Sequence, residues 1–212
     1  MDGMIGAYFN SKFLEHIDPD KIKVILELGS RDGIDALKLS EFYDADVYAF
    51  ECNPHAVADC VSMVGDNNRV EIINKAVWSE NTTIPFYPVV NGNDGASSCF
   101  VANPVYPYER YDQIKVEVEA IRLRDWIDLT GVEPDMLCID LQGAEEHALM
   151  GMGTYLKNVK YVITEGQVSQ MYHGASTIFD IELLLDECGF VMKHNEPVNE
   201  WFGDYLFVKE DE

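Results

Sequence analysis

Short apolar runs alternate with stretches of helical periodicity along most of the chain. Between several runs, apolar residues recur three and four positions apart, as in Val57, Cys60, Val61 and Val64, which indicates helices. Strands that alternate with helices build a mostly parallel sheet covered on both faces. The pattern therefore predicts an α/β fold, with strands at 24–28, 47–50, 70–73, 84–87, 137–139, 161–164 and 205–208.

Two segments add detail to this pattern. Asn53-Pro54 is predicted to begin the helix that contains Cys60, because Asn caps helices and Pro is tolerated at the first helical position. Val116, Val118 and Ala120 alternate with glutamates, which is typical of a strand with one wet face. We expect this strand to be antiparallel and near the edge of the sheet.

The length of 212 residues fits one domain over 1–212, with no internal repeat or linker. Its core is predicted at 24–209, after a helical lead-in at 1–23 whose Phe9, Phe13, Leu14 and Ile17 pack on the core or roof a pocket. Further helices are expected at 143–152 and 178–188, the latter ended by Gly189. The irregular segment 89–111 is either a substrate-facing loop or disordered.

The charge is strongly acidic. Fifteen Lys and Arg stand against 38 Asp and Glu, a formal net charge of -23. This charge would repel nucleic acids and anionic membranes and would favour a cationic ligand, although acidity is also a common solubility or salt-adaptation feature.

The cysteines and the ends of the chain suggest a compartment. The five cysteines are scattered and include no C-x-x-C pair, so we expect reduced thiols rather than a disulfide framework or a zinc site. No apolar run is long enough to span a membrane, and the N-terminus lacks a secretory pattern. We expect a soluble cytoplasmic protein, with a tethered or host-targeted form left open.

The strongest local motif follows the first strand. Glu27-Leu28-Gly29-Ser30-Arg31-Asp32-Gly33 lies between a strand and a helix, where ligands bind in open α/β sheets. Glycines allow close backbone approach, and amide groups at a helix start hold carboxylates or phosphates. The G-x-x-x-G spacing differs from the G-x-G-x-x-G of dinucleotide enzymes.

Three further positions support a ligand cleft. Glu51 ends the second strand, near the interval of about 20 residues at which a carboxylate reaches a ribose diol. Ala76 and Val77 are small apolar residues suited to flank an adenine ring, or they are ordinary core. Asp140 is predicted at the carboxyl end of a strand, and so at the same cleft.

At these motifs the sequence resembles the FkbM-type methyltransferase family. The resemblance runs from about residue 24 to 209. It is carried by the ordered motifs VILELGSRDG (24–33), VYAFECNP (47–54), NKAV (74–77), Ser97-Ser98, LRDWI (123–127), IDLQGAE (139–145), VITE (162–165) and GDYLFVK (203–209).

The resemblance implies a Rossmann-like class I methyltransferase fold with an antiparallel C-terminal strand. It also implies S-adenosylmethionine as cofactor and methylation of a hydroxyl on a small molecule or carbohydrate, such as a sugar, glycan or natural product. Cofactor contacts are expected from Glu27, Gly29, Ser30, Arg31, Asp32, Gly33, Glu51, Cys52, Asn53, Ala76, Val77 and Asp140.

The sequence departs from the family pattern at two places. Gln142 stands where the family often has an acid, so we do not expect a catalytic role there. Cys52 stands where the family more often has Pro, which should alter the turn without removing Glu51.

Methyl transfer to oxygen depends mainly on geometry, with a base to take the hydroxyl proton. The candidate catalytic residues are Asp140, Glu165 and His173. Asp140 and Glu165 could instead bind a divalent cation, Mg or Mn, although no complete metal site is assigned. His147 is expected to be exposed or packed.

Aromatic residues and alternative functions complete the hypothesis. Phe100, Tyr106 and Tyr108 are candidate acceptor contacts, and Trp126 is expected in the core. A nucleotide-dependent oxidoreductase and a non-catalytic methyltransferase-like binding subunit are the alternatives, and a homodimer is possible.

Overall fold

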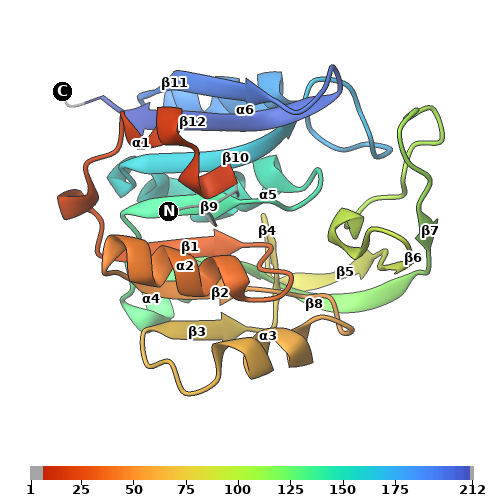
Figure 1. Cartoon of the computed structure of the whole chain (residues 1–212), viewed down its shortest axis with the longest axis horizontal. Helices are drawn as coiled ribbons and strands as arrows, with labels where there is room; N and C mark the ends of the chain where they lie inside the picture. Colours follow the sequence, from red (N-terminus) through yellow and green to blue (C-terminus); the bar gives the residue numbers. More distant parts are fainter. Residues whose placement is uncertain (1–6, 211–212) are drawn as a thin grey trace.

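A twisted seven-stranded sheet forms the centre of the computed structural model, which describes residues 7–210 (Figure 1). Its strand order is β11-β12-β10-β9-β1-β2-β3. The neighbours from β10 to β3 are all parallel, whereas β12 is antiparallel to both β10 and β11. The strands are β1 (Val24–Leu28), β2 (Asp46–Phe50), β3 (Val70–Ile73), β9 (Met136–Ile139), β10 (Tyr161–Gln167), β11 (Phe190–Pro197) and β12 (Phe202–Lys209).

This architecture confirms the predicted class I methyltransferase fold, including the antiparallel C-terminal strand. Alternate residues of the buried strands enter two cores, because side chains of a strand point to opposite faces. Leu26 and Leu28 of β1 join one core, and Ile25 joins the other. Both faces of the sheet are therefore apolar, which explains the nearly continuous apolar runs in the sequence.

Helices cover both faces. On the face in front in Figure 1, α1 (Ser11–Leu14), α2 (Ile34–Tyr43) and α3 (Val57–Val64) are associated with the core that contains Ile25. On the opposite face, α4 (Leu123–Thr130), α5 (Glu145–Met152) and α6 (Ile178–Glu187) pack on the core that contains Leu26. Trp126 of α4 packs edge-on against Tyr48 and Phe50, as expected for a core residue.

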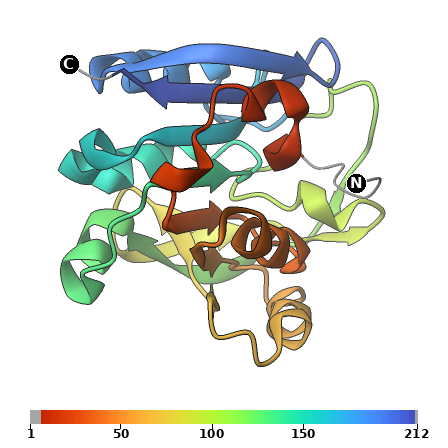
Figure 2. The ribbon, with the colours of Figure 1, turned by 60° about the vertical axis from the view of Figure 1, so that its left-hand side comes forward.

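The N-terminal lead-in is helical in parts where the structure describes it. It consists of η1 (Ala7–Phe9), α1 and η2 (Pro19–Lys21), and Figure 2 shows it lying over the sheet near β10 and β12. Phe9, Phe13 and Ile17 are buried, and Tyr8 lines a cavity. The lead-in thus packs on the core and also covers a pocket; residues 1–6 of the predicted lead-in lie outside the described part.

The predicted start of the third helix was wrong. The helix α3 begins at Val57 instead of at Pro54, after a turn at 54–56. The Asn53 side chain accepts a hydrogen bond from the backbone N–H of His55, 3.1 Å away. Asn53 therefore stabilises a local turn, an alternative that Asn commonly offers to helix capping.

The predicted position of the 116–120 strand was also wrong. It forms β8 (Val116–Arg122), the central strand of a separate three-stranded sheet, parallel to β4 (Ala76–Trp78) and antiparallel to β5 (Thr82–Phe86). The alternation correctly indicated a strand with a wet face. It carried no information about which partner strands would pair with β8.

The segment after β5 forms a lobe beyond the carboxyl ends of β1 and β2 (Figure 1). It contains β6 (Val89–Asn91), η3 (Asp94–Ala96) and β7 (Asp112–Gln113) and is otherwise irregular, as predicted. Neither α4 nor β11 was predicted from the sequence. The strand β11 alternates exposed and half-buried positions at the edge of the sheet, which leaves only a weak apolar signal.

Candidate active site

The candidate ligand-binding cleft lies at β1, the strand from which the chain first adds strands on one side of the sheet and later on the other. After β1 the chain adds β2 and β3 on one side, and β9 later joins β1 on the other side. In open α/β sheets ligands bind at this switch point, outside the carboxyl ends of the strands. Gly29 follows β1 there, and Asp140 follows β9 and donates its backbone N–H to Leu28 O at 2.9 Å.

Two cavities meet at this point. Cavity A is open to solvent, spans about 800 Å³ and extends towards β2 and the 94–99 segment. It is lined by Arg31, Phe50, Glu51, Cys52, Asn53, Ala76, Val77, Phe86, Ser97, Cys99 and Gln142, among others. Cavity B is also open to solvent, spans about 630 Å³ and extends towards β10 and β12, and it is lined by Tyr8, Glu27, Ser30, Asp32, Asp35, Glu165 and Asp204, among others. Gly29, Arg31 and Asp140 line both cavities.

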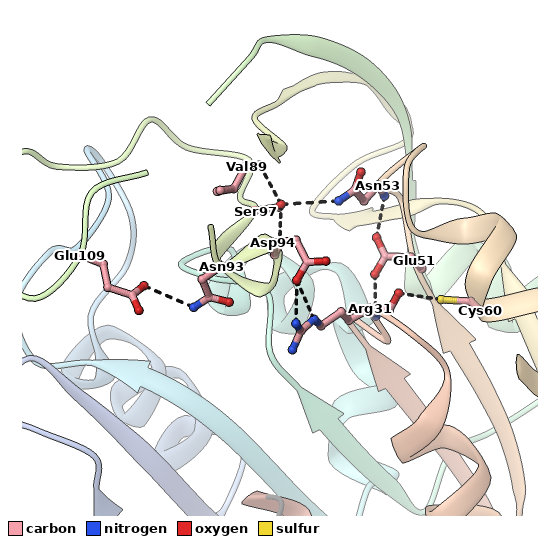
Figure 3. A network of polar contacts seen from close by, with 9 residues as sticks. All are labelled: Arg31, Glu51, Asn53, Cys60, Val89, Asn93, Asp94, Ser97 and Glu109. Atoms are coloured by element: carbon pink, nitrogen blue, oxygen red, sulfur yellow. Dashed lines mark hydrogen bonds and ion pairs between the residues drawn. The ribbon is translucent and has the colours of Figure 1, made fainter. Parts of the chain in front are cut away.

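The carboxylate of Glu51 organises the floor of cavity A (Figure 3). Its two oxygens accept hydrogen bonds from the backbone N–H groups of Arg31, at 2.7 Å, and Asn53, at 2.6 Å. Arg31 has a positive φ of 57°, which turns its N–H towards this carboxylate. The loop after β1 and the loop after β2 are therefore joined through one buried acid.

The segment 94–97 closes over the same loop (Figure 3). The Arg31 guanidinium contacts Asp94 Oδ1 at 2.6 Å, and Asn53 Nδ2 lies 3.5 Å from Ser97 Oγ. The Arg31 and Asp94 side chains are 57% and 64% exposed, so this ion pair contributes little to stability. A contact of this kind can open to admit a ligand at small cost.

Glu27 is the most isolated acid of cavity B. Glu27 is 1% exposed, and its Oε2 atom has no hydrogen-bond partner among the described residues. Burial raises the pKa of Glu27 from 4.5 to about 8. The buried Ser30 hydroxyl, which lines the same cavity, also lacks a partner. Buried polar atoms without partners are costly, so both atoms are suited to bind a ligand.

The Gln142 amide bridges two carboxylates at the junction of the cavities. Nε2 donates to Asp140 Oδ1 at 2.7 Å and to Glu165 Oε1 at 2.8 Å. Tyr172 is fully buried and donates its hydroxyl to Gln142 Oε1 at 2.7 Å, which orients the amide. The buried Ser98 hydroxyl donates to Gln142 O at 2.7 Å. Sequence reasoning assigned no role to Gln142 or Tyr172.

The two bridged acids differ in how strongly they hold a proton. Burial and the charge of Asp140 raise the pKa of Glu165 well above its usual range. Burial also raises the pKa of Asp140, and the Gln142 hydrogen bond and the Arg31 charge oppose this rise. Two close carboxylates do not readily ionise together, so Asp140 is the better candidate for the charged member of the pair.

The structure brings together most of the predicted site, with two exceptions. All the predicted cofactor residues line one or both cavities except Gly33, which instead precedes α2 in a left-handed conformation, with φ of 79°. Asp140 and Glu165 meet as predicted. His173 does not join them: it is exposed, lines neither cavity, and its backbone N–H donates to Val101 O at 2.8 Å. Its neighbour Tyr172 points inward in its place.

The candidate acceptor aromatics also lie outside both cavities. Tyr106 is buried in a cluster with Met171 and Tyr172, and Phe100 packs at the edge of that cluster. Tyr108 is exposed and donates its hydroxyl to Glu200 at 2.7 Å. Tyr106 and Phe100 pack in the cluster of Tyr172, whose hydroxyl contacts Gln142. His147 is half-buried and stacks on Trp78 at a centroid distance of 3.7 Å, as expected for a packed residue.

A divalent-cation site finds no geometric support. Among residues 7–210, no group of three His, Cys, Asp or Glu side chains is arranged to hold a metal ion. The five cysteines are free. Within the same range no helix is both long and apolar enough to cross a bilayer.

The buried acid Glu27 should give the ligand-free protein an unusual pH dependence. The folded protein holds a proton on Glu27 up to about pH 8, whereas the unfolded chain releases it near 4.5. The folded state therefore binds more protons in this window, and the free energy of unfolding should fall as pH rises from 5 to 8. The contribution of this one group is on the order of 4 kcal/mol.

Urea unfolding at a series of pH values would measure this effect. In Glu27→Gln the decline with pH should be clearly shallower, whereas Glu71→Gln, which alters an exposed acid of β3, should follow the wild-type curve. Identical pH curves for Glu27→Gln and the wild type would contradict the assignment of a buried proton to Glu27.

Two solved methyltransferase structures superpose on this fold. Fibrillarin of Aeropyrum pernix, with natively bound S-adenosylmethionine, superposes with a TM-score of 0.55 and 15% identity over 95% of this chain and 76% of that chain. Precorrin-6y C5,15-methyltransferase of Geobacter metallireducens gives a TM-score of 0.54 and 9% identity over 94% and 86%. These likenesses establish the class I methyltransferase fold.

The sequence comparisons identify the family. Residues 27–192 match the methyltransferase FkbM domain, and the chain therefore belongs to this family of S-adenosylmethionine-dependent methyltransferases. A curated relative, the 2-O-methyltransferase NoeI of Sinorhizobium fredii, is 30% identical over 172 residues, which cover 76% of this chain and 68% of the relative. The resemblance stated from the sequence is confirmed, and the oxidoreductase alternative is set aside.

Proposed function

We propose that this methyltransferase transfers the methyl group of S-adenosylmethionine to a hydroxyl group of a small molecule or carbohydrate. The observation that carries the proposal is the position of Asp140 at the junction of cavities A and B, beside the Gly29 loop. A carboxylate at this point lies beside a cofactor that spans the two cavities and faces the space of cavity B that is left for the acceptor. The relative NoeI, a 2-O-methyltransferase, supports oxygen as the acceptor atom.

The residues of the cleft fit the cofactor. Glu51 is buried and presents a carboxylate suited to a ribose diol. Ala76, Val77 and Phe86 give cavity A an apolar wall suited to an adenine ring. The unpartnered Oε2 of Glu27 and the Ser30 hydroxyl suit the ammonium and carboxylate groups of the methionine end. Cys52 and Asn53 complete the wall of cavity A.

The chain's contribution to the reaction is alignment and proton removal. When bound, S-adenosylmethionine supplies a methyl group on a positively charged sulfur, and in the in-line displacement the acceptor oxygen bonds to the methyl carbon as the sulfur leaves. Asp140 takes the proton of the acceptor hydroxyl as the new carbon–oxygen bond forms. Gln142 holds Asp140 and Glu165 at fixed positions, and Tyr172 holds Gln142. Preorganised geometry of this kind supplies most of the rate enhancement in a displacement reaction.

The charge state of the pair fits this role. Glu165 retains its proton more strongly than Asp140, which leaves Asp140 as the base. The single proton of the pair then lies on the residue that is farther from the Gly29 loop. The family acid at position 142 would add a third carboxylate here, whereas the neutral amide of Gln142 donates to both acids.

Cofactor binding can be tested at Glu51. Glu51→Ala should weaken the affinity for S-adenosylmethionine by about 10- to 100-fold, because it removes a charged hydrogen-bond acceptor of the ribose. Isothermal titration calorimetry measures the affinity, and circular dichroism checks the fold. Glu71→Ala, on the neighbouring strand and exposed, is the matched control. An unchanged affinity in Glu51→Ala would remove the ribose contact from the proposal.

The acceptor class can be tested with labelled S-adenosylmethionine. Sugars, glycans and small hydroxyl compounds are offered with and without magnesium or manganese, and the methylated atom of each product is identified by NMR. Transfer to oxygen without added metal is the expected result. Transfer to nitrogen or carbon only, or strict dependence on metal, would contradict the proposal.

A further inference from the structure

Four carboxylates lie side by side across four adjacent strands. Glu165 of β10 is paired with Asp204 of β12, and Asp204 is paired with Glu196 of β11. Asp140 follows Ile139, which is paired with Thr164, so Asp140 stands beside Glu165. Residues that are paired directly across strands point to the same face of a sheet, so these side chains form one row. We call it the carboxylate row.

Only the outer end of the row is neutralised by a basic residue. Glu196 contacts Lys12 Nζ at 3.1 Å. Asp140, Glu165 and Asp204 form no salt bridge within residues 7–210. Like charges directly opposite each other destabilise a sheet. The N-terminal segment offsets this repulsion at Glu196, whereas the inner part of the row remains without a basic partner.

The inner part of the row opens into cavity B. Asp140, Glu165 and Asp204 all line this cavity, together with Glu27, Asp32 and Asp35. Among the residues that the structure describes, Arg31 is the only basic residue that lines it, and its guanidinium contacts Asp94 at 2.6 Å. Six acids and one basic residue therefore line cavity B next to the Gly29 loop.

Polar groups without partners point to ligands at both ends of this space, with Glu27 and Ser30 at the cofactor end and Asp204 at the other end. The Glu27 and Ser30 side chains are more than nine-tenths buried, line cavity B, and have polar atoms without a hydrogen-bond partner among the described residues. Burial also raises the pKa of Asp204 to about 7, which indicates an acid held without a compensating charge. A cationic ligand would supply the missing partner.

We propose that Glu165 and Asp204 form a binding site for an ammonium group on the acceptor, so that the substrate is an amino alcohol or amino sugar. This inference rests on the proposed function and deepens it. Directly paired residues have Cβ atoms about 5 Å apart, and an ammonium group has three donors, enough to bridge the Asp204 carboxylate and the carbonyl oxygen of the protonated Glu165 side chain. A hydroxyl next to the ammonium group then reaches Asp140, the next member of the row.

The geometry separates this site from the methionine end of the cofactor. Glu27 on β1 is paired with Cys138, two residues before Asp140, so it lies on the far side of the row from Asp204. The ammonium group of S-adenosylmethionine is assigned to Glu27, and the acceptor ammonium to Glu165 and Asp204. An organic cation is favoured over a metal ion, because no three ligand side chains among residues 7–210 are arranged around one point.

Ligand-observed NMR on the full chain loaded with S-adenosylhomocysteine tests this inference. The probes are 2-aminoethanol and D-glucosamine, with 1,2-ethanediol, D-glucose and N-acetyl-D-glucosamine as neutral counterparts at equal ionic strength. The ammonium probes should bind about tenfold more tightly than their counterparts, as expected for a hydrogen-bonded charge. Asp204→Asn should abolish the difference, whereas Glu196→Gln, on the same row but paired with Lys12, should retain it.

Each outcome decides the question. Equal or absent binding of charged and neutral probes overturns the inference, as does a preference that survives in Asp204→Asn. If Asp204→Asn bound S-adenosylhomocysteine ten times more weakly, Asp204 would belong to the cofactor site instead. If Mg²⁺ raised the thermal stability of the wild type but not that of Asp204→Asn, the site would bind a metal ion. If the wild type failed to bind S-adenosylhomocysteine, the proposed function itself would be contradicted. This binding is measured first, when the protein is loaded with S-adenosylhomocysteine.

Discussion

Asp140→Asn is expected to lower the turnover number by about 10²- to 10⁴-fold, the usual contribution of a general base. The substitution keeps the shape of the side chain and an oxygen that can accept the Gln142 hydrogen bond. It removes the group that takes the acceptor proton. The affinity for S-adenosylmethionine should change by no more than about threefold, because Glu27 and Glu51 remain in place.

Single-turnover kinetics with labelled S-adenosylmethionine measures the methyl transfer step directly. Asp35→Asn is the matched control, since it removes another carboxylate that lines cavity B but is paired with Lys38 and makes no contact with Gln142. The control should retain most of the turnover. Equal loss in both variants would mean that only the overall negative charge of cavity B matters, and an active Asp140→Asn would exclude Asp140 as the base.

Gly29→Ala is expected to reduce the free energy of unfolding by more than about 3 kcal/mol and to abolish cofactor binding. Gly29 has a φ of 93°, and a Cβ there would lie 1.9 Å from the backbone oxygen of Asp140. The overlap can be relieved only if the loop after β1 and the end of β9 move apart. Those two segments carry the residues at the junction of the cavities.

Gly92→Ala separates the two causes of this effect. Gly92 has a similar φ of 99°, but nothing lies within 4 Å of a Cβ built there. Its substitution should cost about 1 to 2 kcal/mol from backbone strain alone and leave cofactor affinity unchanged. Urea unfolding and calorimetry compare the variants. If Gly29→Ala were no more destabilising than Gly92→Ala, the close approach of β1 and β9 at the cleft would be contradicted.

The cofactor side of the cleft could be predicted from the sequence because its residues follow strands locally. Glu27 and Gly29 belong to β1 and its loop, and Glu51 follows β2. Once the strands are parallel and adjacent, their carboxyl ends meet at one edge without further information. Local pattern and sheet direction were sufficient here.

The acceptor side could not be predicted in the same way, because it depends on contacts between distant segments. Tyr172 and His173 are neighbours in the chain, and only the packing of the 171–175 loop determines that the tyrosine turns inward. The carboxylate row depends on the register of β10, β12 and β11, and β11 itself was not predicted. Sequence spacing carries no signal for a register between strands so far apart.

Gln142 departs from the family pattern, and the loss of an acid argued against a catalytic role at this position. That interpretation left a positioning role unrecognised. In the structure the amide donates to two carboxylates at once, from a backbone with φ of 51°. Only the position of Glu165, which is brought close by the pairing of β9 with β10, makes a neutral donor the more suitable residue.

The central claim is that the cofactor lies across the switch point, with its sugar at Glu51, its amino-acid end at Glu27 and its sulfur beside Asp140. A crystal structure of the protein with S-adenosylhomocysteine tests this claim most directly. We expect the ribose hydroxyls within hydrogen-bond distance of the Glu51 carboxylate and the ammonium group at Glu27 Oε2. A nucleoside bound elsewhere, or cavity A filled by the 94–97 segment with no ligand in it, would contradict the account.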